Sequence, residues 1–271
     1  MTAGSAAERK YELTWAEEFD LAPGAQPDPK VWNFDLGDGT AAGIPGWGNS
    51  EREYYLPEAA AFDGQSNLVV SATRQPADNP YGCYYGTPAE WTSAKLTTLN
   101  KLHFRYGRIE GRLQIPKGLG TWPAFWMLGS NIASVPWPQC GEIDIMEARG
   151  DLPTTLYGTV HGPEYFGDQG LGTTILTPAP MADDFHTFAI DWLPDEIRWY
   201  FDGELFHQTS ASEAAPKEWV FNHDFYLVFN LAMGGHFTGP IDPALNSAEY
   251  KLDYIRHYSI DGVGEVITCS E

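Results

Sequence analysis

Short runs of β-branched and aromatic residues, separated by turns rich in Gly and Pro, constrain the fold of this chain more than any other feature. Runs of this kind are typical of β-strands. They lie at residues 67–73, 104–115, 121–128, 142–146, 154–161, 186–192, 196–201 and 225–233. Asp202-Gly203 lies between two apolar runs and favours a tight antiparallel hairpin. We predict an all-β fold, a sandwich of two antiparallel sheets, with at most a short helical turn at 211–219.

The length of the chain indicates one domain. With 271 residues, 43% of them apolar, the chain can bury the core of a single sandwich. No apolar stretch of about eighteen residues occurs, and residues 1–10 lack the apolar core of a signal peptide. We therefore expect no membrane span, and we expect that any export signal has been removed or was never present.

The net charge limits the classes of partner. Lys and Arg number 16 and Asp and Glu number 37, so the formal net charge is −21. Such a charge repels nucleic acid phosphates and anionic lipid headgroups, whereas an acidic surface most often only keeps a protein soluble. We expect neither nucleic acid nor membrane as a partner, and we expect a monomer.

The three cysteines, Cys83, Cys140 and Cys269, match no zinc-binding spacing. A Cys83–Cys140 disulfide in an oxidising compartment and three free thiols are both open, because sequence alone does not fix connectivity.

The segment GEIDIMEARG at 141–150 contains three acids whose spacing conflicts with a regular strand. Side chains alternate between faces, so Glu142 and Asp144 share a face while Glu147 should point to the other. A β-bulge with Ile145 or Met146 as the extra residue would return Glu147 to the face of Glu142. Three merely solvated acids, or a Ca²⁺ or Mg²⁺ site formed by the three carboxylates, are the alternatives.

Polar and aromatic residues gather on one face of the neighbouring runs. Trp122 and Trp126 are an even number of residues apart and share a face. The same alternation places Tyr157 with His161, and turns Asn230 away from its apolar neighbours. Indole rings stack on sugars while polar groups bond the hydroxyls, so carbohydrate is the substrate class that this face favours. Core packing is the alternative for the tryptophans.

Two glutamates on such a face predict a glycosidase. Carboxyls about 5 Å apart would favour a retaining mechanism, whereas an inverting pair is roughly 6.5–9.5 Å apart. Asp144 between them would separate their proton affinities, so that one is ionised and the other protonated.

These residues resemble glycoside hydrolase family sixteen, and specifically its bacterial laminarinase-type endo-1,3-β-glucanases. GEIDIMEARG and TWPAFWML resemble the family's active-site region, and E-x-D-x-x-E resembles its laminarinase branch. Further matches cover most of the chain in family order, for example WGNSEREYY, GTVHG and FNLAMGG. The resemblance implies a β-jelly roll with a concave substrate cleft. It assigns one domain to residues 9–262, with 1–8 and 263–271 as terminal extensions.

The resemblance also implies roles for individual residues. Glu142 matches the nucleophile, Glu147 the general acid/base, and Asp144 the residue that assists the nucleophile. Substrate contacts are implied for Asn49, Glu51, Arg74, Trp122, Trp126, Trp137, His161 and Asn230. For Arg74 a surface ion pair, and for His161 a structural role, are the alternatives.

A structural Ca²⁺ is implied at Glu18, the Gly64 carbonyl and Asp253, by resemblance alone, and no cofactor is expected for catalysis. The implied function is a secreted, retaining endo-hydrolase of β-1,3-glucans such as laminarin, with mixed β-1,3/1,4-glucan as a second candidate substrate. A non-catalytic β-glucan-binding protein on the same fold, and a hydrolase or transglycosylase of the family acting on another polysaccharide, remain the competing interpretations. Residues 75–93 and 236–246 are expected to shape the ends of the cleft.

Overall fold

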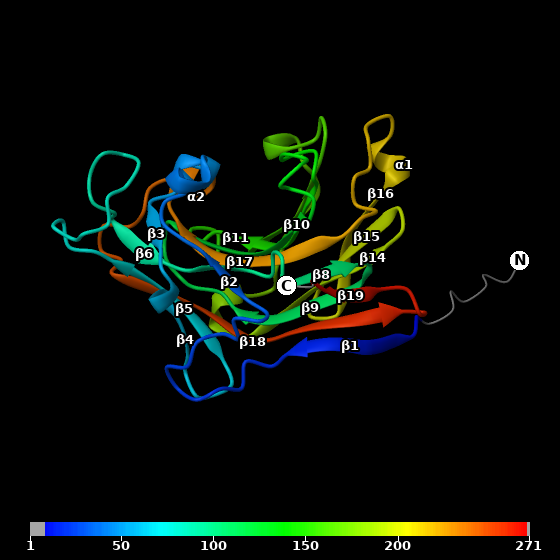
Figure 1. Ribbon diagram of the computed structural model, residues 1–271, viewed down its shortest axis with the longest axis horizontal. Coiled ribbons are helices and arrows are strands. Elements are labelled where there is room, and N and C mark those ends of the chain that lie inside the picture. The colour runs from blue at the N-terminus through cyan, green and yellow to red at the C-terminus, as the bar shows by residue number, and fades with distance from the viewer. Residues whose placement is uncertain (1–8, 270–271) are drawn as a thin grey trace, which may run out of the picture.

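A computed structural model describes residues 9–269 and forms two stacked β-sheets (Figure 1). The first sheet contains β16 (Glu204–Ser210), β15 (Glu196–Phe201), β14 (His186–Leu193), β9 (Gly107–Gln114), β18 (Ser247–Ile260), β5 (Leu68–Arg74), β6 (Trp91–Ser93) and β3 (Glu53–Tyr55) in this order, with β1 (Tyr11–Glu17) beside β18 and β4 (Ala60–Phe62) beside β5. The paired strands are antiparallel, apart from the parallel pair β3 and β6.

The second sheet carries the predicted site. It contains β13 (Leu171–Leu176), β12 (Thr155–His161), β11 (Glu142–Ala148), β10 (Thr121–Gly129), β17 (Phe225–Met233), β7 (Lys95–Thr97) and β2 (Asn33–Asp35) in this order, while β8 (Leu102–Arg105) pairs with β17 and with β19 (Glu265–Thr268). Figure 1 shows β10, β11 and β17 above the first sheet, with loops rising on both sides of them. The expected jelly-roll sandwich is confirmed.

Helical segments are short. They are α1 (Ala211–Ala214), α2 (Gly235–Thr238) and the 3₁₀ turns η1 (Thr40–Ala42), η2 (Pro45–Gly48), η3 (Pro57–Ala59), η4 (Gly167–Gln169) and η5 (Met181–Asp183). The turn expected at 211–219 is α1. Within residues 9–269, no helix is long and apolar enough to cross a membrane.

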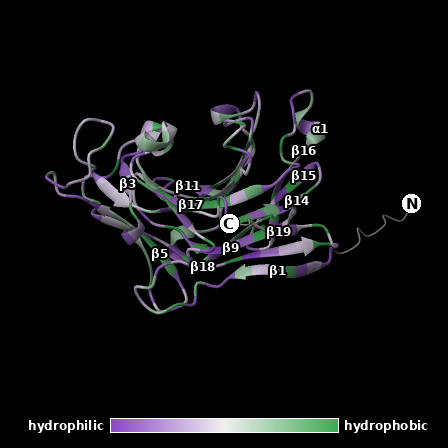
Figure 2. Cartoon of the chain, in the orientation of Figure 1, coloured by the Kyte–Doolittle hydropathy of each residue, from purple (hydrophilic) through white to green (hydrophobic). Residues whose placement is uncertain are grey.

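The core lies between the sheets because each strand directs alternate side chains inward. Phe125 and Met127 of β10 are fully buried, and Trp122 and Trp126 project from the opposite face. Figure 2 shows the corresponding alternation of hydrophilic and hydrophobic residues along the strands of both sheets. The indole N–H of Trp199 on β15 donates to the main-chain oxygen of Asp144 at 2.8 Å, which ties the two sheets together beside the site.

Two expectations change. The run 104–115 was predicted as one strand, but it is divided between β8 and β9, which belong to different sheets. Tyr106 and Gly107 have φ values of 61° and 90°, and this left-handed pair turns the chain from one sheet to the other. The predicted domain end at residue 262 precedes β19, which pairs with β8, so the second sheet continues to Thr268. The extension 1–8 lies outside the described residues.

Candidate active site

The predicted β-bulge is present in β11. Asp144 pairs with Thr159 of β12 and Glu147 with Tyr157, so Ile145 and Met146 together oppose Gly158. Against β10, the register omits Ile145, which identifies it as the extra residue. Ile145 and Met146 are both buried in the core, and Glu147 therefore returns to the face of Glu142.

The three acids lie where two cavities meet on the outer face of the second sheet. The first cavity, of about 310 Å³, is lined by Glu142, Asp144 and Glu147. The second, of about 1070 Å³, contains Glu142 and Glu147 as well. We call the two cavities together the cleft. Their shared lining residues are Asn49, Trp122, Trp137, Glu142 and Glu147.

Burial raises the proton affinity of all three acids. Burial, with repulsion from Asp144, raises the pKa of Glu142 to about 8. Burial and repulsion from Glu147 raise the pKa of Asp144 well above its ordinary range. Burial also raises the pKa of Glu147, against His161 and a hydrogen bond from Trp122, which lower it. The acids therefore hold protons at a pH where solvated carboxyls would have lost them.

The tryptophans predicted on this face are part of the cleft and orient polar groups in it. The indole N–H of Trp122 donates to Glu147 Oε1 at 2.9 Å. That of Trp126 donates to Asn230 Oδ1 at 2.8 Å. Trp137 is 41% exposed at the cleft edge, with its ring centroid 6.4 Å from that of His161. Each indole N–H therefore bonds a polar side chain on a neighbouring strand, which fixes the ring in the cleft.

Asn49 and Glu51 line the first cavity and belong to the same hydrogen-bond network. Asn49 Nδ2 donates to Glu51 Oε1 at 3.0 Å, and Tyr55 Oη donates to Glu51 Oε2 at 3.2 Å. Asn230 Nδ2 donates to Tyr55 Oη at 3.0 Å. Through Asn230, the network reaches Trp126.

Arg74 is placed differently from the other predicted substrate residues. Its guanidinium donates to the main-chain oxygens of Leu245 at 2.8 Å and Asp242 at 2.9 Å, and it lies over the Trp91 ring. Arg74 lines neither cavity. The structure therefore gives it a role in holding the 242–245 loop and does not bring it together with the cleft residues.

Three further cleft residues were not predicted individually. Phe237 on α2 packs against Trp122 and Tyr157, at centroid distances of 4.9 and 5.0 Å. Lys95 Nζ lies 4.2 Å from the Trp47 ring centroid and 5.3 Å from that of Trp126. Phe237 falls in the segment 236–246 expected at a cleft end. Trp47 is the first residue of the motif WGNSEREYY, whereas no feature of the sequence singled out Lys95.

The predicted calcium ligands are engaged with arginines. Both carboxylate oxygens of Glu18 accept hydrogen bonds of 2.8 Å from Arg256, and Asp253 Oδ2 lies 2.5 Å from Arg112 Nη1. Gly64, with φ of 74°, packs against Pro23. A cation site needs carboxylates free to face the ion. As arranged here, these residues do not fit a shared Ca²⁺.

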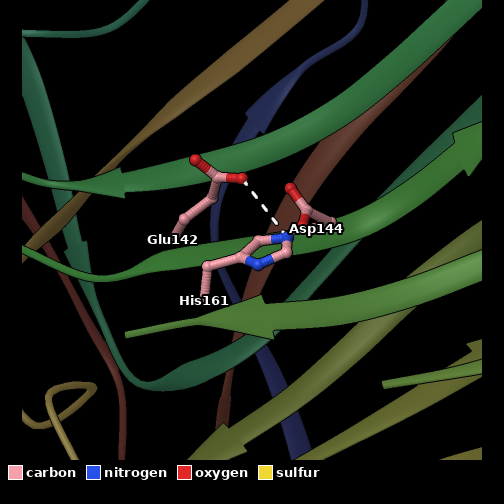
Figure 3. A group of neighbouring side chains, drawn as sticks. All are labelled: Glu142, Asp144 and His161. Carbon is pink, nitrogen blue, oxygen red and sulfur yellow. Dashed lines mark ion pairs between the residues drawn. The ribbon is translucent and has the colours of Figure 1, made fainter. Parts of the chain in front are cut away.

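A different group could hold a metal ion. Glu142, Asp144 and His161 each offer a ligand atom, all within 4.8 Å of one another (Figure 3). His161 Nε2 lies 3.1 Å from Asp144 Oδ2 and 3.7 Å from Glu142 Oε1. A mixed nitrogen and oxygen set suits Zn²⁺ better than Ca²⁺. Because the same atoms belong to the acid cluster, a bound ion would block it.

The cysteines form no bridge in the part of the chain described here. All of Cys83, Cys140 and Cys269 are free thiols, and Cys140 is buried. Of the two alternatives left open by the sequence, a Cys83–Cys140 disulfide and three free thiols, the structure has the free thiols.

Comparison with known proteins agrees with this geometry. The profile of Glycosyl hydrolases family 16 matches residues 58–256. The chain is 38% identical over 262 residues to a beta-glucanase of Rhodothermus marinus, with 92% of this chain and 85% of the relative covered. It is also similar to the laminarinase catalytic domain from Thermotoga maritima MSB8, with 45% identity, a TM-score of 0.85, and 92% and 98% of the two chains covered. For the endo-beta-1,3-glucanase from Pyrococcus furiosus, the identity is 42%, the TM-score 0.86 and the coverage 93% and 95%. The chain belongs to glycosyl hydrolases family 16.

Proposed function

We propose that this protein is a retaining endo-β-1,3-glucanase that hydrolyses laminarin-type β-1,3-glucans. The observation that carries the proposal is the bulge in β11, which gathers Glu142, Asp144 and Glu147 on one face beside Trp122 and Trp126 of the neighbouring strand β10. The relatives named above, a beta-glucanase, a laminarinase and an endo-beta-1,3-glucanase, support this substrate class. Cavities extend from both sides of the acids, so a polymer can pass across them and be cut internally.

The first step requires one ionised and one protonated glutamate. Glu142 attacks the anomeric carbon, and Glu147 donates its proton to the departing glycosidic oxygen. Repulsion from Asp144 contributes to the raised pKa of Glu142. Burial and the Glu147 charge raise the pKa of Asp144 well above its ordinary range, and a proton on Asp144 would remove that repulsion and could be donated in a hydrogen bond to the Glu142 anion. Glu142 is then the nucleophile.

In the second step, Glu147 acts as a base. It takes a proton from water, and the water attacks the anomeric carbon and displaces Glu142. The sugar released has the original anomeric configuration. Trp122 holds Glu147 in place through both states, because its indole N–H can donate to the carboxylate or to the carbonyl oxygen of the acid. No step uses a metal or another cofactor.

The direct test is incubation with laminarin and measurement of reducing ends. Release of a series of oligosaccharides, with the β-anomer appearing first in ¹H NMR, is the expected result. A protein that binds laminarin without releasing reducing ends would be a glucan-binding protein instead. A panel containing mixed β-1,3/1,4-glucan, agarose and carrageenan distinguishes the proposed enzyme from other polysaccharide hydrolases. Products longer than the substrate would reveal transglycosylation.

We also propose that the protein acts outside the cell as a monomer. An extracellular location is proposed because a polysaccharide substrate is too large to enter a cell intact. Activity in the culture medium of the source cells, and a single 30.1 kDa species in sedimentation, are the expected results.

A further inference from the structure

A second pair of buried acids lies under the wall of the cleft, and the proposed mechanism does not use it. Glu51 is 5% exposed and Glu53, at the start of β3, is 1% exposed. Glu53 Oε2 accepts the main-chain N–H of Met233 at 2.7 Å. Glu53 Oε1 is buried and has no hydrogen-bond partner among the described residues, and the Glu51 carboxyl is its close neighbour. Two acids in this relation cannot both be anions at low cost.

Glu51 is the member of the pair that reaches the cleft. Its two oxygens already accept hydrogen bonds from Asn49 and Tyr55, so it is held as an acceptor by neutral donors. Tyr55 is in turn joined to Asn230, and Asn230 to the indole of Trp126. A shift of Glu51 would therefore move one of the rings that floor the first cavity.

We propose that Glu53 is a protonated positioning residue, whose carboxyl donates from Oε1 to Glu51 and holds Glu51 and the Trp126 ring in place for the sugar. The inference rests on the proposed function of the cleft. Glu53 does not touch substrate, because Glu51 lies between it and the cavity. With the proton on Oε1, this buried atom, which otherwise has no partner among the described residues, becomes the donor of a hydrogen bond to Glu51.

The charges around the pair agree with one shared proton. Lys95 on β7 lies close enough to stabilise the Glu51 anion, but it also pairs with Asp35 at 3.3 Å. Burial and the Glu51 charge together raise the pKa of Glu53 well above its ordinary range. The titratable and charged groups that face the pair are Glu51, Tyr55, Tyr84, Lys95 and Glu147.

Two substitutions distinguish the hydrogen bond that Glu53 donates from the volume that its side chain fills. Glu53→Gln keeps the shape and provides an N–H donor that cannot ionise, whereas Glu53→Met keeps the volume without a donor. We expect the KM of the wild type for laminarin to rise as Glu53 ionises at alkaline pH, and the KM of Glu53→Gln to stay flat over the same range. Glu53→Met should raise KM about tenfold or more at neutral pH, with a smaller effect on kcat, because Glu51 loses one hydrogen bond to a charged group. Glu249→Gln, on an exposed residue of β18, is the matched control.

Thermal unfolding gives a readout that is independent of activity. An acid whose pKa is raised in the folded state stabilises the fold fully below its unfolded pKa, and this contribution is lost as pH rises through the folded pKa. The Tm of Glu53→Gln relative to wild type should therefore increase from pH 4 to pH 9. The inference is wrong if the KM of Glu53→Gln changes with pH as the wild-type KM does and the difference in Tm between the two proteins stays constant from pH 4 to pH 9. If the wild type releases no reducing ends, the proposed function fails, and the Tm comparison still decides whether Glu53 holds the proton.

Discussion

The hydrogen bond from Trp122 to Glu147 allows a sharp test of the acid/base assignment. Trp122→Phe keeps an aromatic ring on the floor of the cleft but removes the N–H that lies 2.9 Å from Glu147 Oε1. That donor favours the ionised form of Glu147 and lowers its pKa. Its removal should therefore raise the pKa of the general acid, so that Glu147 stays protonated to higher pH.

The size of the shift follows from the energy of such a bond. A hydrogen bond to a charged group contributes about 1.5–3 kcal/mol, and one pKa unit corresponds to about 1.4 kcal/mol. The full range is about 1–2 units. Water can replace the indole in an open cleft, so we expect a value near the lower end, about 1 unit upward.

The measurement is the pH profile of kcat/KM on laminarin, whose alkaline limb reports the acid of the free enzyme. Trp126→Phe is the matched control, because its indole lies on the same strand face but donates to Asn230 rather than to a carboxylate. Both variants are also tested with Glu53→Gln, which removes the second group that ionises at alkaline pH. An alkaline limb that moves down, or moves equally in both variants, would show that Glu147 is not the general acid.

The remaining predictions concern the nucleophile, metals and stability. Glu142→Gln should lower the rate of reducing-end release by at least about 10³-fold while laminarin binding persists; near-normal turnover would reassign the nucleophile. Chelation with EDTA should change neither Tm nor activity, because Glu18 and Asp253 pair with arginines, whereas a Tm that rises on adding calcium would support the predicted calcium site. Added Zn²⁺ should inhibit by binding Glu142, Asp144 and His161, and His161→Gln should weaken that binding in calorimetry. Asp191→Ala should lower the free energy of unfolding by about 3–5 kcal/mol in guanidinium titrations, since the fully buried carboxylate accepts hydrogen bonds from Arg9, Tyr11, Arg108 and Tyr200.

Alternation along the strands was enough to predict which residues share the cleft face. Trp122 and Trp126 lie in the cleft, and the residues between them include the buried Phe125. The bulge could be inferred because the position of Glu147 conflicts with strict alternation, and the conflict has a local solution. Both inferences use the geometry of a single strand, which sequence determines well.

Contacts between distant segments could not be read in this way. The residues next to Arg74 in the sequence do not reveal whether its side chain contacts a sugar or a loop. Only the fold brings the main-chain oxygen of Leu245 to it. The break between β8 and β9 depends on left-handed backbone at Tyr106, a residue type that rarely adopts it. Lys95 is placed under two tryptophan rings by the pairing of β7 with β17, across more than a hundred residues of sequence.

The balance of charge in the cleft itself favours a neutral polymer. Four buried or half-buried acids, Glu51, Glu142, Asp144 and Glu147, line the cleft, and Lys95 is engaged by Asp35 and by two indole rings. An anionic sugar would meet these acids at short range, where water screens charge poorly, and its approach would also raise their pKa values further. A neutral glucose unit has no such cost, and its hydroxyls can donate to the carboxylates that the network holds in place. We therefore expect the same excess of acid that raises the proton affinity of the catalytic group to disfavour anionic polysaccharides.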